Sequence, residues 1–361
     1  MVVGVLKEIK QAEKRVSMTP AGVDLMTKNG HKVLVESSSG EGSGFSNKAY
    51  QSAGAEIVAT PEEIFERAEM VMHVKEIMPS EYELLREGQI VFTYLHLAAD
   101  PRQAEALQAS RCVAIAYETV QTADKKLPLL QPMSEVAGRM SIQEGARFLE
   151  MPQGGSGILL GGVPGVAPAK VVIIGGGIVG TNAAKIACGM GADVTIFDVN
   201  LDRLRYLDDI MPANCKLLMS NPYIITEELK QADMVIGSVL IAGAKAPKLV
   251  TREVVSQMKK GSVMVDVAID QGGCFETSKP TSHENPVYTV DGVIHYCVTN
   301  MPGAVARTST MALTNATLPY AIAIANKGWE KAIAEDKALA LGLNVLDGEI
   351  VFGAVREALL S

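Results

Sequence analysis

The chain lacks the features of a secreted protein and those of a nucleic-acid-binding protein. Its first residues, "MVVGVLKEIK", show no charged start, long apolar core and small-residue cleavage site, so no signal peptide is expected. Lys and Arg do not gather in one block, and the formal net charge is −8. An acidic chain without a basic patch argues against a nucleic-acid partner.

The chain is also poor in cysteine and has no long uninterrupted apolar run. The cysteines form no CxxC pair, so neither a zinc site nor a disulfide framework is predicted; they are Cys112, Cys188, Cys215, Cys274 and Cys297. We expect buried thiols in a reducing compartment, and therefore a cytoplasmic protein. The longest apolar stretches are rich in glycine and are cut by Lys170, Asn182 and Lys185, so no membrane span is predicted.

What is present is a regular alternation of strand-like and helix-like segments. The 361 residues, 48% of them hydrophobic, are enough for two domains. In the first segment, strands are expected at 2–6, 31–36, 56–58, 70–74, 90–97 and 112–118, with helices between them that include "PEEIFERA" and "SEYELLREG". Apolar strands without strict alternation are typical of a parallel sheet covered by helices. Thr19 with Pro20, and Asp100 with Pro101, have the pattern of helix starts.

A second series of strands begins at Lys170, after a helix predicted from Ser134 to Leu149 and a loop over 152–169. Its strands are expected near 171–175, 193–198, 216–219, 234–239, 262–267 and 293–298. From Gly303 onward only helices are predicted, and these would return to cover the first sheet. The expected fold is α/β, with two doubly wound Rossmann-like domains and an active-site cleft between them. The catalytic domain would comprise 1–130 plus 304–361, and the nucleotide-binding domain 131–303.

The segment "KVVIIGGGIVGTNAAKIACGMGADVTIFDVN" carries the most specific motif. Gly175, Gly177 and Gly180 fit G-x-G-x-x-G between a strand and a helix, and Asp198 follows at the end of the next strand. The glycines would allow a tight turn, close approach of a pyrophosphate and packing of helix on strand. The alternative, a crossover whose glycines serve packing alone, is disfavoured by this context.

The acid at the end of the second strand predicts which cofactor binds. A carboxylate at Asp198 can accept hydrogen bonds from ribose hydroxyls and would repel a 2′-phosphate, which favours NAD over NADP. Arg203 could weaken this preference by pairing with a phosphate. We favour the alternative that Arg203 is a solvated helix residue near the adenine edge.

Polar residues at expected strand ends are candidates for a substrate site. In the first domain these are Arg15, Lys75 and His96; in the second they are Asp266 and Asp270. Each has a structural alternative: a surface loop charge, a solvated strand end, a hydrogen-bonded core histidine or a turn cap. Asp266 lies inside an apolar run and is favoured as structural, and His73 and His295 are favoured as core histidines. Together, two cations, a histidine and an acid could hold a carboxylate and a carbonyl and move protons.

Several longer motifs resemble the alanine dehydrogenase and transhydrogenase α-subunit family over essentially the whole chain. They are "KEIKQAEKRVSMTP", "HVKE", "TYLHLA", "QPMSEVAGRMS", "GGVPGVAPAKVVIIGGGIVG", "VDVAIDQGG" and "VTNMPGAVARTSTMALTNATLPY". Departures are small: Ser17 stands where alanine is expected, and Lys279 and Arg203 stand where relatives carry Arg and Lys. These exchanges keep the charge but change the geometry of cofactor contacts.

The resemblance implies roles for individual residues. Arg15 and Lys75 would bind the substrate, and His96 and Asp270 would do acid–base work. The residues implied to line the cofactor site are Ser134, Gly175, Gly177, Ile178, Val179, Gly180, Asp198, Arg203, Ser220, Val239, Leu240, Val267, Ala268, Ile269, Asp270, Lys279, Val298, Thr299, Asn300 and Met301. It also implies a homohexamer, NAD as the cofactor, no metal, and L-alanine or pyruvate with ammonium as small-molecule substrates.

The expected activity is the reversible NAD-dependent oxidative deamination of L-alanine. Two alternatives remain open from the sequence. One is the NAD-binding component of a nicotinamide nucleotide transhydrogenase, which would need no amino-acid acid–base pair. The other is a non-enzymatic NAD-sensing regulator, which would need Asp198 but not Arg15, Lys75 and His96 together.

Overall fold

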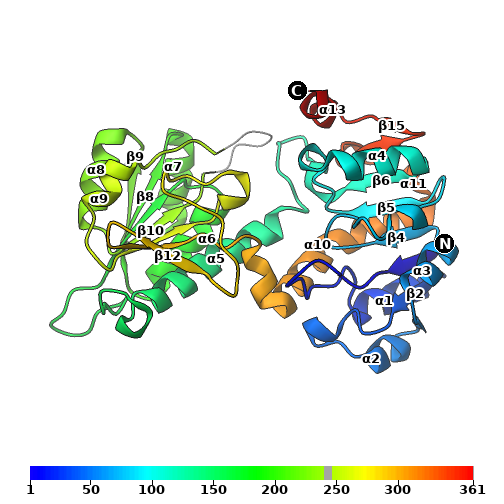
Figure 1. Ribbon diagram of the computed structural model, residues 1–361, viewed down its shortest axis with the longest axis horizontal. Coiled ribbons are helices and arrows are strands. Elements are labelled where there is room, and N and C mark those ends of the chain that lie inside the picture. The colour runs from blue at the N-terminus through cyan, green and yellow to red at the C-terminus, as the bar shows by residue number, and fades with distance from the viewer. Residues whose placement is uncertain (240–245, 361) are drawn as a thin grey trace. The chain divides into compact units, whose positions relative to one another are not determined.

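The protein folds into two compact units (Figure 1). The computed structural model describes residues 1–239 and 246–360. Unit 1 comprises residues 1–133 and 303–361, and unit 2 comprises residues 134–302. Each unit has its own sheet flanked by helices.

Unit 1 is built on an eight-stranded sheet with the order β15-β14-β6-β5-β4-β1-β2-β3. Its strands are β1 (Val2–Val5), β2 (Lys32–Glu36), β3 (Glu56–Val58), β4 (Met70–Met72), β5 (Ile90–Thr93), β6 (Val113–Ala116), β14 (Leu343–Leu346) and β15 (Glu349–Ile350). The first six strands pair in parallel, whereas β14 pairs antiparallel with both β6 and β15. The chain therefore returns at its C-terminal end to extend the first sheet.

The helices of unit 1 begin at residues with the expected capping chemistry. Thr19 accepts a hydrogen bond from the Gly22 amide at 3.2 Å, and Asp100 accepts one from the Gln103 amide at 3.3 Å, each directly before a proline. The helices are α1 (Pro20–Lys28), α2 (Asn47–Ser52), α3 (Pro61–Arg67), α4 (Pro101–Ser110), α10 (Ala306–Lys327), α11 (Trp329–Glu335), α12 (Lys337–Ala340) and α13 (Gly353–Leu360). Short 3₁₀ turns are η1 (Glu41–Ser43), η2 (Tyr82–Leu84), η3 (Leu97–Ala99) and η4 (Tyr117–Thr119).

Unit 2 is built on a seven-stranded sheet with the order β12-β13-β11-β10-β7-β8-β9. Its strands are β7 (Lys170–Ile174), β8 (Asp193–Asp198), β9 (Cys215–Met219), β10 (Met234–Gly237), β11 (Val263–Asp266), β12 (Val287–Val290) and β13 (Val293–Tyr296). Its helices and turns are α5 (Gln131–Phe148, starting in the last residues assigned to unit 1), η5 (Met151–Gln153), α6 (Ile178–Gly189), α7 (Leu201–Ile210), α8 (Pro222–Gln231), α9 (Arg252–Ser256), η6 (Ile269–Gln271) and η7 (Met301–Val305). Apart from the antiparallel β12, the strands pair in parallel.

Both sheets have the doubly wound strand order. In unit 1 the parallel strands run β3-β2-β1-β4-β5-β6, and in unit 2 they run β9-β8-β7-β10-β11-β13. The first strand lies in the middle of each series, and the crossovers reverse direction beside it. This confirms the prediction of two Rossmann-like units. Ligands of such sheets bind beyond the carboxyl ends of the strands at the reversal point.

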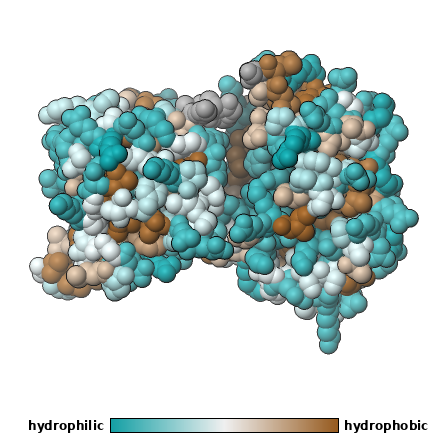
Figure 2. Space-filling model, in the orientation of Figure 1, coloured by the Kyte–Doolittle hydropathy of each residue, from teal (hydrophilic) through white to brown (hydrophobic). Residues whose placement is uncertain are grey.

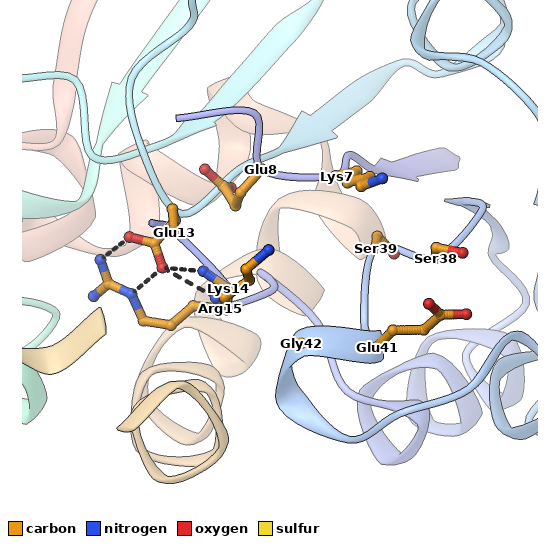
Figure 3. Close-up of a pocket in the computed structure, with 9 residues that line it drawn as sticks. All are labelled: Lys7, Glu8, Glu13, Lys14, Arg15, Ser38, Ser39, Glu41 and Gly42. Atoms are coloured by element: carbon orange, nitrogen blue, oxygen red, sulfur yellow. Dashed lines mark hydrogen bonds and ion pairs between the residues drawn. The ribbon is translucent and has the colours of Figure 1, made fainter. Parts of the chain in front are cut away.

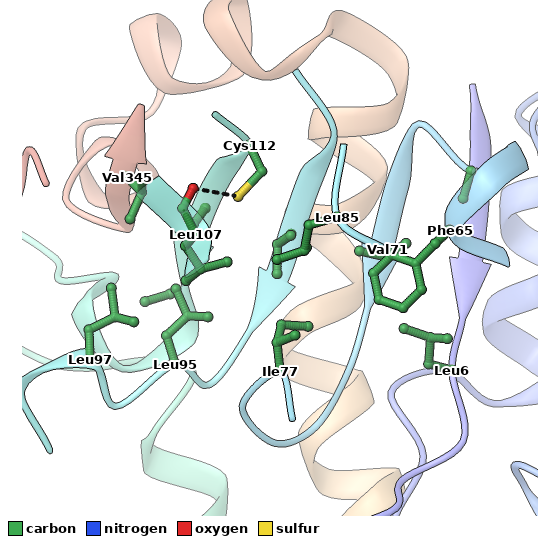
Figure 4. Packing of buried hydrophobic residues seen from close by; sticks show 14 of the residues in the cluster. Leu6, Phe65, Val71, Ile77, Leu85, Leu95, Leu97, Leu107, Cys112 and Val345 are labelled. Atoms are coloured by element: carbon green, nitrogen blue, oxygen red, sulfur yellow. Dashed lines mark hydrogen bonds between the residues drawn. The ribbon is translucent and has the colours of Figure 1, made fainter. Parts of the chain in front are cut away.

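Apolar side chains fill the space between sheet and helices. In unit 1, Leu6, Leu95 and Leu107 belong to one buried cluster that also includes Val345 from the C-terminal segment (Figure 4). Burying such a side chain contributes about 1.5–3 kcal/mol, so Val345 ties the returning segment to the first sheet. The face drawn in Figure 2 is mainly hydrophilic, with apolar residues in smaller patches. Within the two described ranges, no helix is long and apolar enough to cross a membrane.

The prediction that only helices follow Gly303 is wrong. Residues 343–350 form a hairpin, β14–β15, whose turn holds Asp347 and Gly348 at φ of 51° and 82°. The unpredicted strand β12 forms a similar hairpin with β13, turning at Asp291 and Gly292 with φ of 52° and 88°. Asp-Gly in a two-residue turn with positive φ at both positions is a strong hairpin signal.

Two predicted elements are shorter than expected. The segment "SEYELLREG" holds only the 3₁₀ turn η2, and the strand expected over 90–97 ends at Thr93. Beyond Thr93 the chain turns sharply, and His96 takes the left-handed conformation with φ of 51°. One expected buried thiol, Cys215, is partly exposed, while the other four cysteines are buried; all five are free thiols.

A buried ionic cluster lies at the reversal point of the unit 1 sheet. His73, just after β4, places Nδ1 2.8 Å from Glu8 Oε1 and Nε2 3.0 Å from Glu81 Oε1. Burial opposes protonation of His73, but the charges and hydrogen bonds of Glu8 and Glu81 outweigh burial and raise its pKa well above the ordinary value. His73 is thus a hydrogen-bonded core residue that joins the segments following β1 and β4.

Replacing His73 by leucine should destabilise unit 1 strongly. It would leave two buried carboxylates without their cation, which typically costs about 3–5 kcal/mol. Because the folded-state pKa of His73 is raised, its contribution is complete below pH about 6.5 and is lost as pH rises through that higher value. Urea unfolding of the unmodified protein and of His73→Leu at several pH values should show a difference in free energy of unfolding that becomes smaller in the alkaline range. A difference that grows there would contradict a protonated His73.

Candidate active site

The glycine loop after β7 brings two backbone segments into contact. Gly175 has φ of 103°, and a Cβ there would lie 2.9 Å from the Ser238 carbonyl oxygen at the end of β10. A Cβ on Gly180 would lie 1.8 Å from the Gly175 carbonyl oxygen. These two glycines are therefore required by the turn itself and by the packing of α6 on β7.

Gly177 has a different environment. It is the N-cap of α6, no side chain caps the helix there, and a Cβ on it would meet nothing within 4 Å. The N–H groups in the first turn of this 12-residue helix, with the positive end of the helix dipole, thus begin at a residue whose Cβ position is open. That this loop holds the pyrophosphate of a dinucleotide stays a prediction from the glycine spacing.

Asp198 and Arg203 both hold the glycine loop. The Asp198 carboxylate, at the end of β8, accepts hydrogen bonds from the amides of Gly176 and Asn200, each at 2.8 Å. Arg203 donates from Nε to the Gly176 carbonyl oxygen at 2.6 Å and from Nη2 to Thr181 Oγ1 at 2.7 Å. Arg203 is thus partly buried and holds the loop through hydrogen bonds, rather than being a solvated helix residue.

Most residues implied for the cofactor site lie at the carboxyl edge of the unit 2 sheet. Ser220 follows β9, Val239 follows β10, the segment 267–270 follows β11, and the segment 298–301 comes shortly after β13. Ser134 lies on α5, and Lys279 is exposed, with its amide donating to the Tyr288 hydroxyl at 2.7 Å. Ile178 and Val179 begin α6, and Leu240 lies outside the described residues.

Two carboxylates near the end of β11 differ in their surroundings. Asp266 is fully buried and accepts hydrogen bonds from Ser278 Oγ at 2.5 Å and from the Cys274 amide at 2.8 Å; burial raises its pKa, although these bonds oppose the shift. Asp270 is exposed, and its carboxylate has no hydrogen bond to any described residue. Asp266 is therefore structural. The turn-cap alternative for Asp270 has no supporting contact, so its carboxylate is open to solvent and ligands.

In unit 1, Arg15 is held by a carboxylate that the sequence reasoning missed. Arg15 is 2% exposed, and its Nε and Nη2 donate to the two oxygens of Glu13 at 2.7 and 2.6 Å (Figure 3). Its Nη1 donates to Met133 Sδ at 3.0 Å. This two-point contact fixes the plane of the guanidinium. Arg15 and Glu13 line a cavity of about 220 Å³. The other residues that line it are Lys7, Glu8, Lys14, Ser38, Ser39, Glu41 and Gly42.

The pKa values of the Arg15 and Lys75 side chains are shifted in opposite directions. Burial disfavours the charged form of Arg15, but hydrogen bonds and charge from Glu13 outweigh it, so the pKa of Arg15 lies above its ordinary value. Burial, followed by the positive charges of Arg15 and Lys10, lowers the pKa of Lys75. Lys75 follows β4, and its carbonyl oxygen accepts a hydrogen bond from Thr93 Oγ1 at 2.7 Å. The site therefore combines a permanent cation with a more acidic ammonium group.

His96 lies at the same edge of the unit 1 sheet, after β5. It is exposed, and its imidazole stacks on Tyr94 with ring centroids 5.9 Å apart. His295, in contrast, is buried and hydrogen-bonded to Thr277 Oγ1 at 2.7 Å, as expected of a core histidine. Residues 1–239 and 246–360 contain no cluster of side chains suited to a metal ion. Unit 1 thus places Arg15, Lys75 and His96 at one edge.

Comparison with known proteins shows to which family the chain belongs. Two family models match, "Alanine dehydrogenase/PNT, N-terminal domain" over residues 4–137 and "Alanine dehydrogenase/PNT, C-terminal domain" over residues 141–353. The alanine dehydrogenase of Methanococcus maripaludis is 60% identical over 359 residues, covering 99% of this chain and 96% of that one. The chain belongs to the alanine dehydrogenase/PNT family.

Solved structures of the family show the same fold. An L-alanine dehydrogenase superposes with a TM-score of 0.96 at 52% identity, covering 99% of both chains. A transhydrogenase from Sinorhizobium meliloti gives a TM-score of 0.82 at 22% identity, covering 98% of this chain and 100% of that one, which supports the fold alone. The N-terminal model spans Arg15, Lys75 and His96, and the C-terminal model spans the glycine loop and Asp270.

Two glycine substitutions should separate folding from dinucleotide binding in this alanine dehydrogenase/PNT chain. Gly177→Ala should fold normally, because its Cβ meets no protein atom, but should weaken NADH binding at least about tenfold by filling the pyrophosphate space. Gly180→Ala should lower the thermal stability of unit 2, because its Cβ would collide with backbone. Circular dichroism melting and NADH fluorescence titration measure both effects. Normal NADH affinity in folded Gly177→Ala would refute the assigned pyrophosphate position.

Proposed function

We propose that the protein is an NAD-dependent L-alanine dehydrogenase. It converts L-alanine, NAD and water into pyruvate, ammonium, NADH and a proton, and the reaction is reversible. The observation that carries the proposal is the buried, Glu13-oriented Arg15 together with Lys75 at the reversal point of one sheet, in a chain whose second sheet carries the dinucleotide loop. The 60% identity to an alanine dehydrogenase over nearly the whole chain supports the same activity.

Arg15 and Lys75 are proposed to bind the amino acid. The Arg15 guanidinium, fixed by Glu13, suits the substrate carboxylate because its planar fork can form paired hydrogen bonds. Lys75 would donate to the oxygen that becomes the ketone. Its lowered pKa makes the ammonium a better proton donor than an exposed lysine. Met133, which contacts Arg15, would border the methyl group of alanine.

His96 and Asp270 are proposed as the acid–base residues. Bound NAD supplies the hydride acceptor. Loss of hydride from Cα gives an iminium ion, water adds to it, and the carbinolamine collapses to pyruvate and ammonium. His96 suits the proton transfers because imidazole titrates near neutral pH. Asp270, exposed and without a hydrogen bond to a described residue, would orient the substrate nitrogen and the attacking water.

The activity and the choice of cofactor can be tested in one assay. Absorbance at the NADH band, with L-alanine and either NAD or NADP, should show turnover with a strong preference for NAD. Asp198→Ser should shift the ratio toward NADP, because it removes the negative charge that repels a 2′-phosphate. Absence of alanine-dependent NADH formation would contradict the proposed activity. In that case, oxidation of NADH by a nucleotide acceptor would favour a transhydrogenase component, and binding of NADH without oxidation would favour a regulator.

Assembly and location follow from the same proposal. We propose a homohexamer in the cytoplasm; five free thiols are consistent with a reducing compartment. Sedimentation equilibrium measures the assembly directly, and a mass other than six times 38.4 kDa would refute the hexamer.

The pairing of His96 with Asp270 gives a further prediction. His96→Ala and Asp270→Asn should each reduce turnover at least about a hundredfold, because each proton transfer needs its own positioned group. Because the two residues are proposed to act as one unit, the double variant should be little worse than the poorer single variant. Steady-state kinetics of the unmodified protein, the two single variants and the double variant provides this double-mutant cycle. Losses that multiply would show independent roles, and near-full activity of either single variant would remove that residue from the reaction.

A further inference from the structure

The backbone at His96 has a conformation that is costly for this residue type. His96 has φ of 51° and ψ of 36°, in the left-handed region that L-residues other than glycine rarely adopt. Such a residue keeps this conformation only when the surrounding structure imposes it. The imidazole leaves the chain in a direction set by this conformation, so whatever imposes it also aims the ring.

One carboxylate gathers the amides on either side of the turn. Glu118, in η4 after β6, accepts a hydrogen bond from the His96 amide at 2.6 Å. It also accepts the Leu95 amide, at 3.1 Å to Oε1 and 3.2 Å to Oε2. The relative direction of two consecutive N–H groups is set by φ and ψ of the first residue. Their convergence on one anion therefore keeps Leu95 out of the extended conformation and fixes the peptide plane that precedes His96.

Other contacts also hold the turn: the His96 carbonyl oxygen accepts a hydrogen bond from the Ala99 amide at 2.9 Å. The Tyr94 hydroxyl donates to the Leu129 carbonyl oxygen at 2.5 Å, and Gln103 Nε2 donates to the Leu95 carbonyl oxygen at 2.7 Å. Among the residues that the structure describes, none accepts or donates a hydrogen bond at the His96 imidazole. The ring is therefore oriented by the backbone conformation and by stacking on Tyr94.

We propose that Glu118 is a positioning residue of the reaction, which fixes the peptide plane before His96 and so directs the imidazole toward the substrate. The inference rests on the proposed role of His96. Glu118 itself does not touch the reacting atoms, and its effect passes entirely through His96. If Glu118 served stability alone, its removal would change kcat by the same factor whether or not the His96 imidazole is present.

The test compares Glu118→Ala, His96→Ala and the double variant with the unmodified protein. The matched control is Glu69→Ala, because the Glu69 carboxylate accepts the Val2 amide, also at 2.6 Å, at the opposite, amino-terminal end of β1 in the same unit. Readouts are kcat, KM for L-alanine, NADH affinity, melting temperature and the crystal structure of Glu118→Ala. Glu118→Gln keeps one acceptor oxygen and should recover part of any loss.

Glu118→Ala should lower kcat at least about tenfold, with NADH affinity kept, whereas adding it to His96→Ala should change kcat less than about twofold. Glu69→Ala should leave kcat within about twofold. Equal losses in both His96 backgrounds, or a loss matched by Glu69→Ala, would overturn the proposal. If the unmodified protein does not oxidise alanine, the proposed function fails, and the crystal structure decides separately: an unchanged Leu95–His96 peptide plane in Glu118→Ala overturns the role of Glu118, and a rotated plane supports it.

Discussion

In both units the first strand lies in the middle of its parallel series, and the chemistry depends on this constraint. Crossovers leave β1 and β7 in opposite directions, so the carboxyl ends of two neighbouring strands face a space that no connection covers. In unit 2 that space receives the glycine loop and the start of α6. In unit 1 it receives the segments after β1, β4 and β5, which carry Arg15, Lys75 and His96. The same topology thus places a helix N-terminus at the reversal point of one unit and two cationic side chains at that of the other.

Carboxylates hold most of the functional groups in place. Glu13 orients the Arg15 guanidinium, Glu118 gathers the amides of the His96 turn, and Asp198 anchors the glycine loop through the Gly176 amide. In each case an anion accepts short hydrogen bonds from donors that the fold would otherwise leave poorly satisfied.

Sequence patterns predicted the parallel strands, the glycine loop and the strand-end location of the site residues, because these follow from local periodicity and topology. They missed the C-terminal hairpin and β12, although Asp347-Gly348 and Asp291-Gly292 carry a local turn signal that was readable. The supporting acids could not be found in this way. Glu118 reaches the His96 amide across 22 residues of sequence, through the pairing of β5 with β6, and no local pattern records that contact.

The pair Asp266 and Asp270 shows why residue type alone does not assign a role. Both acids lie within the same short segment after or at the end of β11, yet the fold gives them opposite environments. Asp266 is enclosed by amides and Ser278 Oγ, so its oxygens are committed to holding the 266–278 turn. Asp270 is one turn further along, exposed and available to a ligand. The lone pairs of Asp266 are largely committed to the backbone and to Ser278, whereas those of Asp270 stay open to a ligand.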